Sequence, residues 1–153
     1  MTKETPSSKY PDADAKKYIR AVIGAQAFAL ETFDVEDVLL PQRYTPIPLS
    51  PFAVLGMINL RGRIVTVLSL RRLLGMDDPG DGASCRHIVF RRDAELYSFI
   101  VDEVSDIIDL SPADIRKPPE NLSPEWKDLT VGVRPALKEL TVILDPEKIF
   151  ATL

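Results

Sequence analysis

The chain has 153 residues, of which 45% are hydrophobic and 27% are charged, a composition typical of one compact globular unit. Its net charge of −4 argues against general binding to nucleic acid or to an anionic membrane surface. No apolar run approaches the roughly 20 residues of a membrane span, so membrane insertion is not expected. The single cysteine excludes an internal disulfide and fits a reducing compartment. The polar N-terminal stretch has no signal-peptide core, and 1–16 is expected to be disordered.

The first part of the chain predicts short β-strands. Alternating apolar residues predict a hairpin formed by 18–23 and 27–31, followed by a third apolar segment at 35–40. The stretch 41–51 contains four prolines, which a central strand cannot accommodate, so we expect an irregular edge or loop there.

The stretch 56–75 predicts a second hairpin followed by a short helix. Apolar strands flank a turn at which Gly62 can take the positive φ that a tight turn needs. Ser69 can cap the helix that follows. Arg61 has no core to fill at the hairpin tip, so we expect it to be solvated, to pair with an acid on the neighbouring segment 35–38, or to bind a partner.

The second part of the chain predicts five further strands and two helical segments. The strands are expected at 87–90, 96–101, 104–108, 129–133 and 140–144. Ser111 and Asp114 have the spacing of a capping box, and Asp145 can cap a terminal helix. Trp126 lies in a proline-broken loop over 117–128, where it either covers the core or anchors a partner.

Two segments repeat with similar patterns. Residues 64–74 and 140–150 both read as an apolar strand, a capping residue and a short amphipathic helix. Residues 35–38 likewise resemble 104–107. The repetition predicts two similarly built small barrels, and since each would be marginally stable alone, they should share a hydrophobic seam.

The sequence contains no recognisable catalytic or metal-binding motif. Cys85 and His87 would share one face of a strand, but the chain lacks further Cys or His ligands for a metal, so an ordinary strand edge is favoured. The acidic pairs at 36–37 and 102–103 lack a plausible acid–base partner, which favours solvated or salt-bridging roles. An enzyme or small-ligand binder on a β scaffold stays open, and would require a deep polar pocket.

The centre of the hairpin stretch carries a more specific signal. It reads Asn59-Leu60-Arg61-Gly62, between an apolar strand that begins at Gly56 and the sequence Val-Leu-Ser-Leu-Arg-Arg. Together with Val35-Glu-Asp-Val38 and Val101-Asp-Glu-Val-Ser-Asp-Ile-Ile108, this stretch resembles the CheW family of chemotaxis coupling proteins. The resemblance covers roughly residues 18–150.

The resemblance implies a mainly β fold, with two small SH3-like five-stranded β-barrels packed side by side and short helices. It further implies that 17–153 form a single CheW-like domain after a disordered lead-in over 1–16. We expect the first barrel at roughly 27–85 and the second at roughly 86–140, completed by strands from the chain ends.

The resemblance also implies a cytoplasmic adaptor of two-component signal transduction, without catalysis, cofactor or metal. Such an adaptor joins the cytoplasmic tip of a methyl-accepting chemoreceptor to the regulatory domain of a CheA-type histidine kinase, and is recruited to membrane-associated receptor arrays. The implied kinase-binding residues are Val35, Asp37, Val38, Gly56, Arg61 and Gly62, with Arg61 paired to Asp37. The implied receptor-binding residues, near the junction of the barrels, are His87, Val104 and Ile107.

The sequence departs from the family pattern at several positions. Thr66 stands where the family often has proline, and Asp37 stands where glutamate is usual. These departures leave open which pathway the chain serves. The alternative is a CheW-like adaptor of another chemosensory pathway, such as pilus-driven motility or biofilm control.

Overall fold

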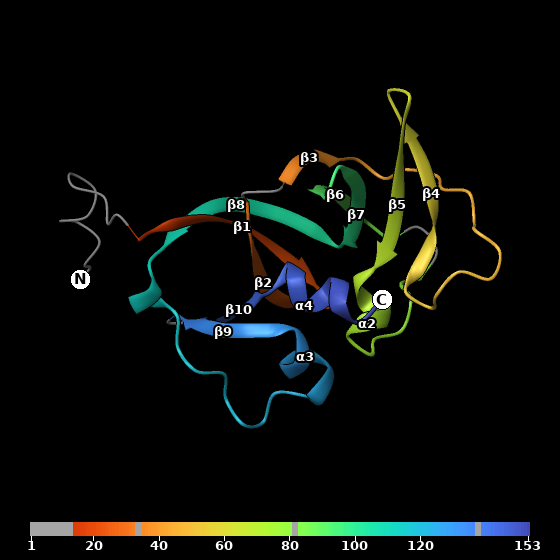
Figure 1. Ribbon diagram of the computed structural model, residues 1–153. Helices are drawn as coiled ribbons and strands as arrows, with labels where there is room; N and C mark the ends of the chain where they lie inside the picture. The colour runs from red at the N-terminus through yellow and green to blue at the C-terminus, as the bar shows by residue number, and fades with distance from the viewer. Residues whose placement is uncertain (1–13, 33–34, 81–82, 137–138) are drawn as a thin grey trace.

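The computed structural model describes residues 14–32, 35–80, 83–136 and 139–153 and consists mainly of two five-stranded sheets (Figure 1). The first sheet contains β3 (Val35–Leu39), β4 (Val54–Leu60), β5 (Arg63–Ser69), β6 (Arg86–Arg92) and β7 (Glu95–Val101). The second sheet contains β1 (Lys16–Ile23), β2 (Gln26–Glu31), β8 (Glu103–Leu110), β9 (Thr130–Pro135) and β10 (Leu140–Leu144). The helical segments are α2 (Leu70–Leu73), a 3₁₀ turn (Pro112–Asp114), α3 (Pro124–Leu129) and α4 (Pro146–Ala151). The predicted fold class is confirmed.

The two sheets have the same topology. The strand order is β3-β6-β7-β5-β4 in the first sheet and β8-β1-β2-β10-β9 in the second. Each sheet has one parallel pair, β5 with β7 and β10 with β2, at the same place in the order. Each of these pairs includes the strand that leads into a short helix, α2 or α4. The repetition that the sequence predicts is therefore a repetition of structure.

The predicted division of the chain between the two units is wrong. The prediction separated 27–85 from 86–140, but β6 and β7 pair with β3 and β5 in the first sheet. Conversely, β2 lies in the second sheet with β1. The first sheet is thus built from 35–101, and the second takes strands from both ends of the chain. Strand propensity does not show which strands will pair when they are far apart in the sequence, as β3 is from β6 and β2 is from β10.

Each sheet curls because its outer strand continues toward the opposite edge. Beyond β3, Thr45 exchanges two backbone hydrogen bonds of 2.9 Å with Met57 of β4. Beyond β8, Arg116 forms the corresponding bridge with Val133 of β9, with N–O distances of 2.7 and 2.9 Å. These bridges connect the edges without a continuous strand ladder, so the units are SH3-like but not fully closed barrels.

One hydrophobic core joins the two sheets. It takes side chains from both, as a shared seam requires, and its larger fully buried members are Ile23, Phe28, Leu30, Leu68, Leu70, Ile88, Phe90, Phe99, Leu144 and Ile149. Neither five-stranded sheet alone encloses this cluster, so burial of apolar surface couples the two halves.

The local predictions have mixed outcomes. The Ser69 hydroxyl accepts a hydrogen bond from the Arg72 N–H at 3.2 Å, and the Asp145 carboxylate accepts one from the Glu147 N–H at 2.9 Å, so both caps are confirmed. Trp126 lies in α3 rather than in a loop, and is partly buried against the core. The predicted disordered stretch 1–16 lies mostly outside the described residues.

Candidate functional site

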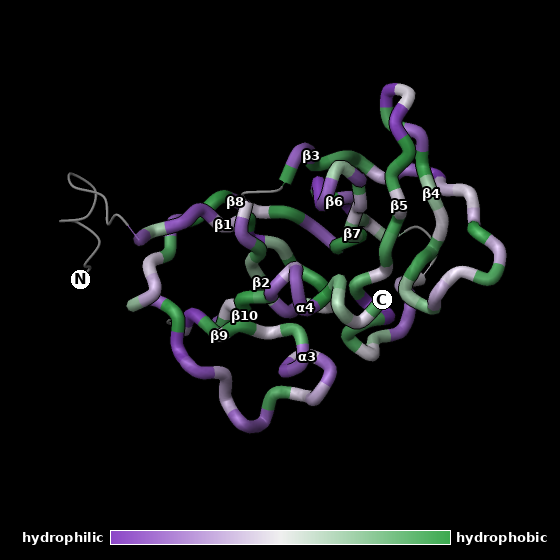
Figure 2. The backbone as a smooth tube through the Cα atoms, viewed as in Figure 1, coloured by the Kyte–Doolittle hydropathy of each residue, from purple (hydrophilic) through white to green (hydrophobic). Residues whose placement is uncertain are grey.

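The tip of the β4–β5 hairpin has a tight left-handed turn. Arg61 and Gly62 have φ angles of 53° and 84°, as in the mirror-image turns that suit the twist of a hairpin. The side-chain oxygen of Asn59 accepts a hydrogen bond of 2.8 Å from the Gly62 N–H. The two strands are largely hydrophobic, whereas the tip is hydrophilic and projects from the sheet (Figure 2). The turn therefore presents the Arg61 guanidinium to solvent.

Arg61 forms an ion pair with Asp37 on β3, as the resemblance implies. The Arg61 Nη2 lies 3.1 Å from Asp37 Oδ2, while Asp37 Oδ1 accepts a hydrogen bond of 2.8 Å from the Val38 N–H. The side chains are 74% and 34% exposed, so the pair is solvated and contributes little to stability. Its consequence is geometric, because it places the Arg61 guanidinium beside the edge strand.

A second acid on β3 holds the side of the same hairpin. Glu36 accepts a short hydrogen bond from Arg91 of β6 and lies 3.5 Å from Arg63 of β5. A β-bulge between Val35 and Asp37 breaks the regular alternation of these neighbouring residues. The sequence shows the two adjacent acids but does not predict a specific partner for Glu36. The strand order that brings Arg63 and Arg91 near Glu36 cannot be derived from the sequence pattern.

Val38 lies beside this ion pair on the edge strand. Its side chain is 38% exposed, and Leu40 just beyond β3 is exposed as well. Val35 is half-buried and packs against the core, so it supports the strand more than it forms the surface. The edge thus combines an apolar contact with an adjacent, oriented pair of charges.

Gly56 has a different position from the other predicted kinase-binding residues. It is buried in β4, where an added Cβ would lie 2.7 Å from the Thr45 carbonyl carbon. Its role is to let the chain beyond β3 approach β4. Gly132 is its counterpart in the second sheet, where a Cβ would lie 2.7 Å from the Arg116 carbonyl oxygen.

The three predicted receptor-binding residues lie on two different sheets and differ in exposure. His87 of β6 is only 1% exposed, whereas Val104 is partly buried and Ile107 is 55% exposed on β8 of the other sheet. His87 therefore cannot offer a direct contact to a partner, and its place in the predicted receptor surface is a correction. Val38 and Ile107 occupy corresponding places, opposite Ile88 and Ile19 and just after a bulge in each edge strand.

The burial of His87 has a local explanation. Its Nε2 accepts a hydrogen bond of 3.4 Å from the Gln42 N–H, which leaves Nδ1 to donate to the Ser98 hydroxyl at 3.1 Å. Burial lowers the pKa of His87 below its ordinary value, because a charged imidazolium would lose hydration. The side chain thus connects the segment after β3 to the first sheet in its neutral form.

An open pocket of about 740 Å³ lies between the segment after β3, β5 and the loop after α2. Its polar wall includes Arg43, Arg71, Asp78 and Cys85. Burial raises the pKa of the Cys85 thiol, which disfavours the nucleophilic thiolate. Among the described residues, no three His, Cys, Asp or Glu side chains gather as metal ligands would. Within the same residues, no helix is long and apolar enough to cross a membrane.

These features define a duplicated β scaffold that presents an ion pair and an exposed apolar side chain at one sheet edge. The sequence profile of the CheW-like domain matches residues 17–153, and the chain belongs to this family. Members of the family act as scaffolds in chemotaxis rather than as catalysts.

Individual relatives resemble the chain over most of its length. The chemotaxis protein CheW of Helicobacter pylori is 29% identical over 143 residues, which cover 94% of this chain and 86% of the relative. That of Thermotoga maritima is 30% identical over 141 residues, with coverage of 90% and 91%. The crystal structure of the scaffolding protein TtCheW from Thermoanaerobacter tengcongensis aligns with a TM-score of 0.72 and 26% identity, covering 84% of this chain and 88% of that one.

Proposed function

We propose that the chain is a non-catalytic cytoplasmic adaptor that couples chemoreceptors to a CheA-type histidine kinase. The proposal combines membership of a chemotaxis scaffold family with the edge formed by β3 and the hairpin tip. The adaptor makes no covalent change. It biases the kinase through contacts that differ between the kinase's states.

The Arg61–Asp37 ion pair is the observation that carries this proposal. It joins the family's Asn-Leu-Arg-Gly turn to the edge strand and leaves Val38 exposed beside it. A sheet edge with one apolar contact and an adjacent pair of opposite charges is suited to docking on a folded domain. The proposed kinase-binding surface consists of Val38, Asp37, Arg61 and Gly62. Val35 and Gly56 support this surface indirectly, by packing against the core and by allowing the segment after β3 to approach β4.

Isothermal titration calorimetry with the isolated regulatory domain of the cognate kinase tests this surface. Arg61→Ala and Val38→Asp should each weaken binding about tenfold or more, as expected for central interface residues. Lys17→Ala is a matched control, because it removes an exposed ion pair with Asp109 on the second sheet. If both edge variants keep the affinity and the circular dichroism spectrum of the wild type, the assigned surface is refuted.

The receptor is proposed to bind near the junction of the two sheets, with Val104 and Ile107 as the candidate contacts. Ile107 is exposed, and Val104 packs partly against the shared core. Receptor arrays would recruit the adaptor to the membrane through many weak contacts that act together. A peptide or coiled-coil fragment of the receptor tip should bind the wild type and lose affinity for Ile107→Asp. Failure of the whole set of cognate receptor tips and kinases to bind would refute the adaptor function.

A further inference from the structure

Asp102 is the only residue between β7 of the first sheet and β8 of the second sheet. The chain therefore passes from one sheet to the other at this residue. Its backbone N–H donates a hydrogen bond of 2.9 Å to the Val22 carbonyl oxygen in the second sheet. The chain crosses between the sheets a second time, from β2, which ends at Glu31, to β3, which begins at Val35, so Asp102 is the shorter of two links. A link of one residue is a natural hinge point, because a change in its two backbone dihedrals would alter the angle between the units.

The Asp102 side chain holds this hinge from both sides. Its two carboxylate oxygens accept hydrogen bonds of 3.0 and 2.9 Å from Arg71 Nη2 on α2, the helix that follows the first sheet's β5. The same carboxylate accepts a hydrogen bond of 2.8 Å from the Gly24 N–H, in the β1–β2 turn of the second sheet. Arg71 is further fixed by a hydrogen bond of 3.1 Å from its Nη1 to the Asp77 carbonyl oxygen. The pair is largely shielded, with side-chain exposures of 18% and 29%.

The opposite pair of elements makes a reciprocal contact. α4, which follows β10 of the second sheet, places Phe150 against Tyr97 of the first sheet, with ring centroids 4.8 Å apart. Arg92, just before the β6–β7 turn, lies 4.6 Å above the Phe150 ring and pairs with Glu147 at 2.8 Å. Thus α4 contacts a hairpin of the first sheet directly, whereas α2 reaches the β1–β2 turn of the second sheet through the Asp102 carboxylate. Both helices lie between the sheets in Figure 1.

The two reciprocal contacts differ in kind. The α4 contact is mainly apolar, through Phe150, and apolar burial tolerates small rotations because it has little directionality. Its ion pair between Arg92 and Glu147 is solvated, since Glu147 is 74% exposed, and constrains the angle little. Charge-assisted hydrogen bonds require defined angles, and one carboxylate that accepts from both sheets satisfies its donors in only a narrow range of orientations. We infer that Asp102, held by Arg71 and Gly24, is a hinge lock that sets the angle between the two sheets and hence between their edge strands β3 and β8.

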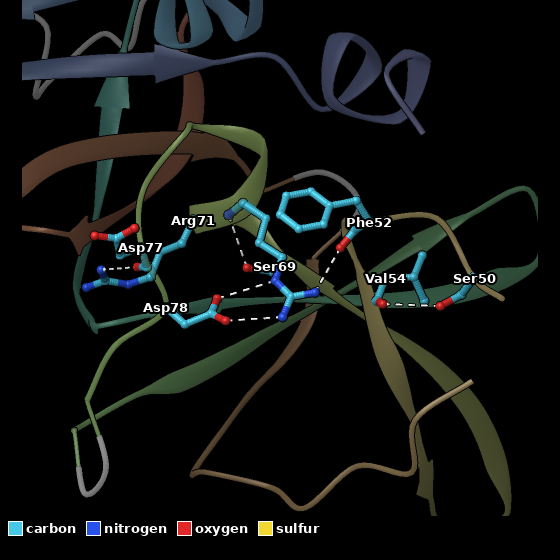
Figure 3. A network of polar contacts seen from close by, with 8 residues as sticks. Ser50, Phe52, Val54, Ser69, Arg71, Asp77 and Asp78 are labelled. Atoms are coloured by element: carbon cyan, nitrogen blue, oxygen red, sulfur yellow. Dashed lines mark hydrogen bonds and ion pairs between the residues drawn. The ribbon is translucent and has the colours of Figure 1, made fainter. Parts of the chain in front are cut away.

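The neighbouring arginine provides a matched control. Arg72 pairs with Asp78 at 3.1 Å and donates a hydrogen bond of 3.0 Å to the Phe52 carbonyl oxygen. Figure 3 shows Phe52 and Asp78 converging on one guanidinium, close to Arg71 and its contact with Asp77. This second pair sits on the same short helix but connects only segments of the first sheet. Its loss should leave the angle between the sheets unchanged.

Distance measurement on the isolated protein tests the hinge lock without any partner. Nitroxide labels are attached at Ile64→Cys on β5 and Val131→Cys on β9, two exposed positions in different sheets, in a Cys85→Ser background. Pulsed electron paramagnetic resonance spectroscopy then gives the distribution of distances between the two labels, and hence between the sheets. Asp102→Asn and Arg71→Met should broaden or shift this distribution, whereas Asp78→Asn should leave it as in the parent.

Distributions for Asp102→Asn and Arg71→Met that match the parent would refute the hinge lock. Arg71→Met keeps the test decisive if Asp102→Asn does not fold, because it removes the charge from α2 while retaining an apolar stem. The same substitutions in a protein with both labels on the first sheet should give an unchanged distribution, since only motion between the sheets is expected.

A binding measurement links the hinge lock to function and rests on the proposed adaptor role. The kinase-binding surface lies within the first sheet, so Arg71→Met should leave affinity for the kinase regulatory domain unchanged. Affinity for the receptor tip, proposed to bind at the junction, should fall about tenfold. If the parent protein binds neither partner, the adaptor function fails, while the distance measurement still decides the hinge lock.

Discussion

Gly56 lies directly against the backbone of Thr45, and a Cβ atom on Gly56 would lie 2.7 Å from the Thr45 carbonyl carbon. The adjacent residue, Met57, exchanges two backbone hydrogen bonds with Thr45. This approach connects the chain beyond β3 to β4 and curls the first sheet. The requirement for glycine at position 56 is thus explained by the fold, without any contact to a partner.

Gly56→Ala should destabilise the protein by about 3 kcal/mol, at the upper end for overpacking, because the new methyl group meets backbone rather than a flexible side chain. Gly62→Ala should cost only about 1 kcal/mol. A Cβ there meets nothing within 4 Å, and only the positive φ of 84° opposes it. Urea unfolding followed by circular dichroism compares the two. Equal losses would show that the Thr45 contact does not determine the requirement for glycine.

Gly132→Ala extends this test to the second sheet. A Cβ at Gly132 would lie 2.5 Å from the Ile115 Cγ2 and 2.7 Å from the Arg116 carbonyl oxygen. The loss should resemble that of Gly56→Ala, although Gly132 lies outside the stretch 56–75 that carries the family resemblance. A neutral Gly132→Ala would contradict the equivalence of the two closure points.

The local structure around these positions was predictable from sequence, whereas their long-range roles were not. Turn chemistry identifies Gly62, and capping chemistry identifies Ser69 and Asp145, because both depend on a few neighbouring residues. The role of Gly56 depends on Thr45, eleven residues earlier in a proline-rich stretch. No pattern in single-residue propensity reports such an approach between segments.

The Arg61–Asp37 pair should matter for binding and little for folding. Arg61→Ala and Asp37→Asn should each change the free energy of unfolding by less than about 1 kcal/mol, since the arginine is 74% exposed. A double-mutant cycle on kinase binding should show coupling between the two residues. Additive effects on binding would indicate that each residue contacts the kinase independently and that the pair does not organise the edge.

The duplicated caps provide a matched pair of substitutions. Ser69→Ala and Asp145→Ala each remove a side-chain acceptor from the first turn of a helix, and each should cost about 1 kcal/mol. Ser69→Asp and Asp145→Ser exchange the two capping residues and should retain most of the stability. Differential scanning calorimetry measures both sets. A much larger loss for the exchanges than for the alanines would contradict the structural equivalence of the caps.

Phe150 is expected to hold α4 against the first sheet. Phe150→Ala should cost about 3 kcal/mol through lost ring contacts with Tyr97 and Phe99. Trp126 of α3, which lies beside α4, gives a fluorescence signal for the release of this helix. Glu147→Gln is the control, because it weakens only the ion pair with Arg92 and leaves the ring in place; since Glu147 is 74% exposed, it should cost about 1 kcal/mol or less. Similar losses for both variants would argue against the ring as the main contact.

The sequence anticipated the ion pair of the candidate site but misplaced His87. Family resemblance transfers a motif reliably where its residues are adjacent, as at the hairpin tip. Near the junction of the two sheets, the resemblance named residues but did not indicate whether their side chains are exposed. Alternation along β6 does not predict which face is covered, since that depends on the segment after β3, where Gln42 and its N–H lie over the imidazole.

The buried His87 predicts a specific pH dependence of stability. Burial lowers the pKa of the folded state below the ordinary value of 6.5, so the neutral form contributes fully above that value. As pH falls below about 6.5, the unfolded chain takes up the proton first, and the free energy of unfolding decreases until the lower folded pKa is reached. His87→Gln can keep the hydrogen bonds to Gln42 and Ser98 but cannot titrate. The difference in unfolding free energy between wild type and His87→Gln, measured in urea from about pH 7.5 to 5.5, should shift against the wild type as pH falls. A difference that stays constant over this range would show that His87 is not held neutral by the fold.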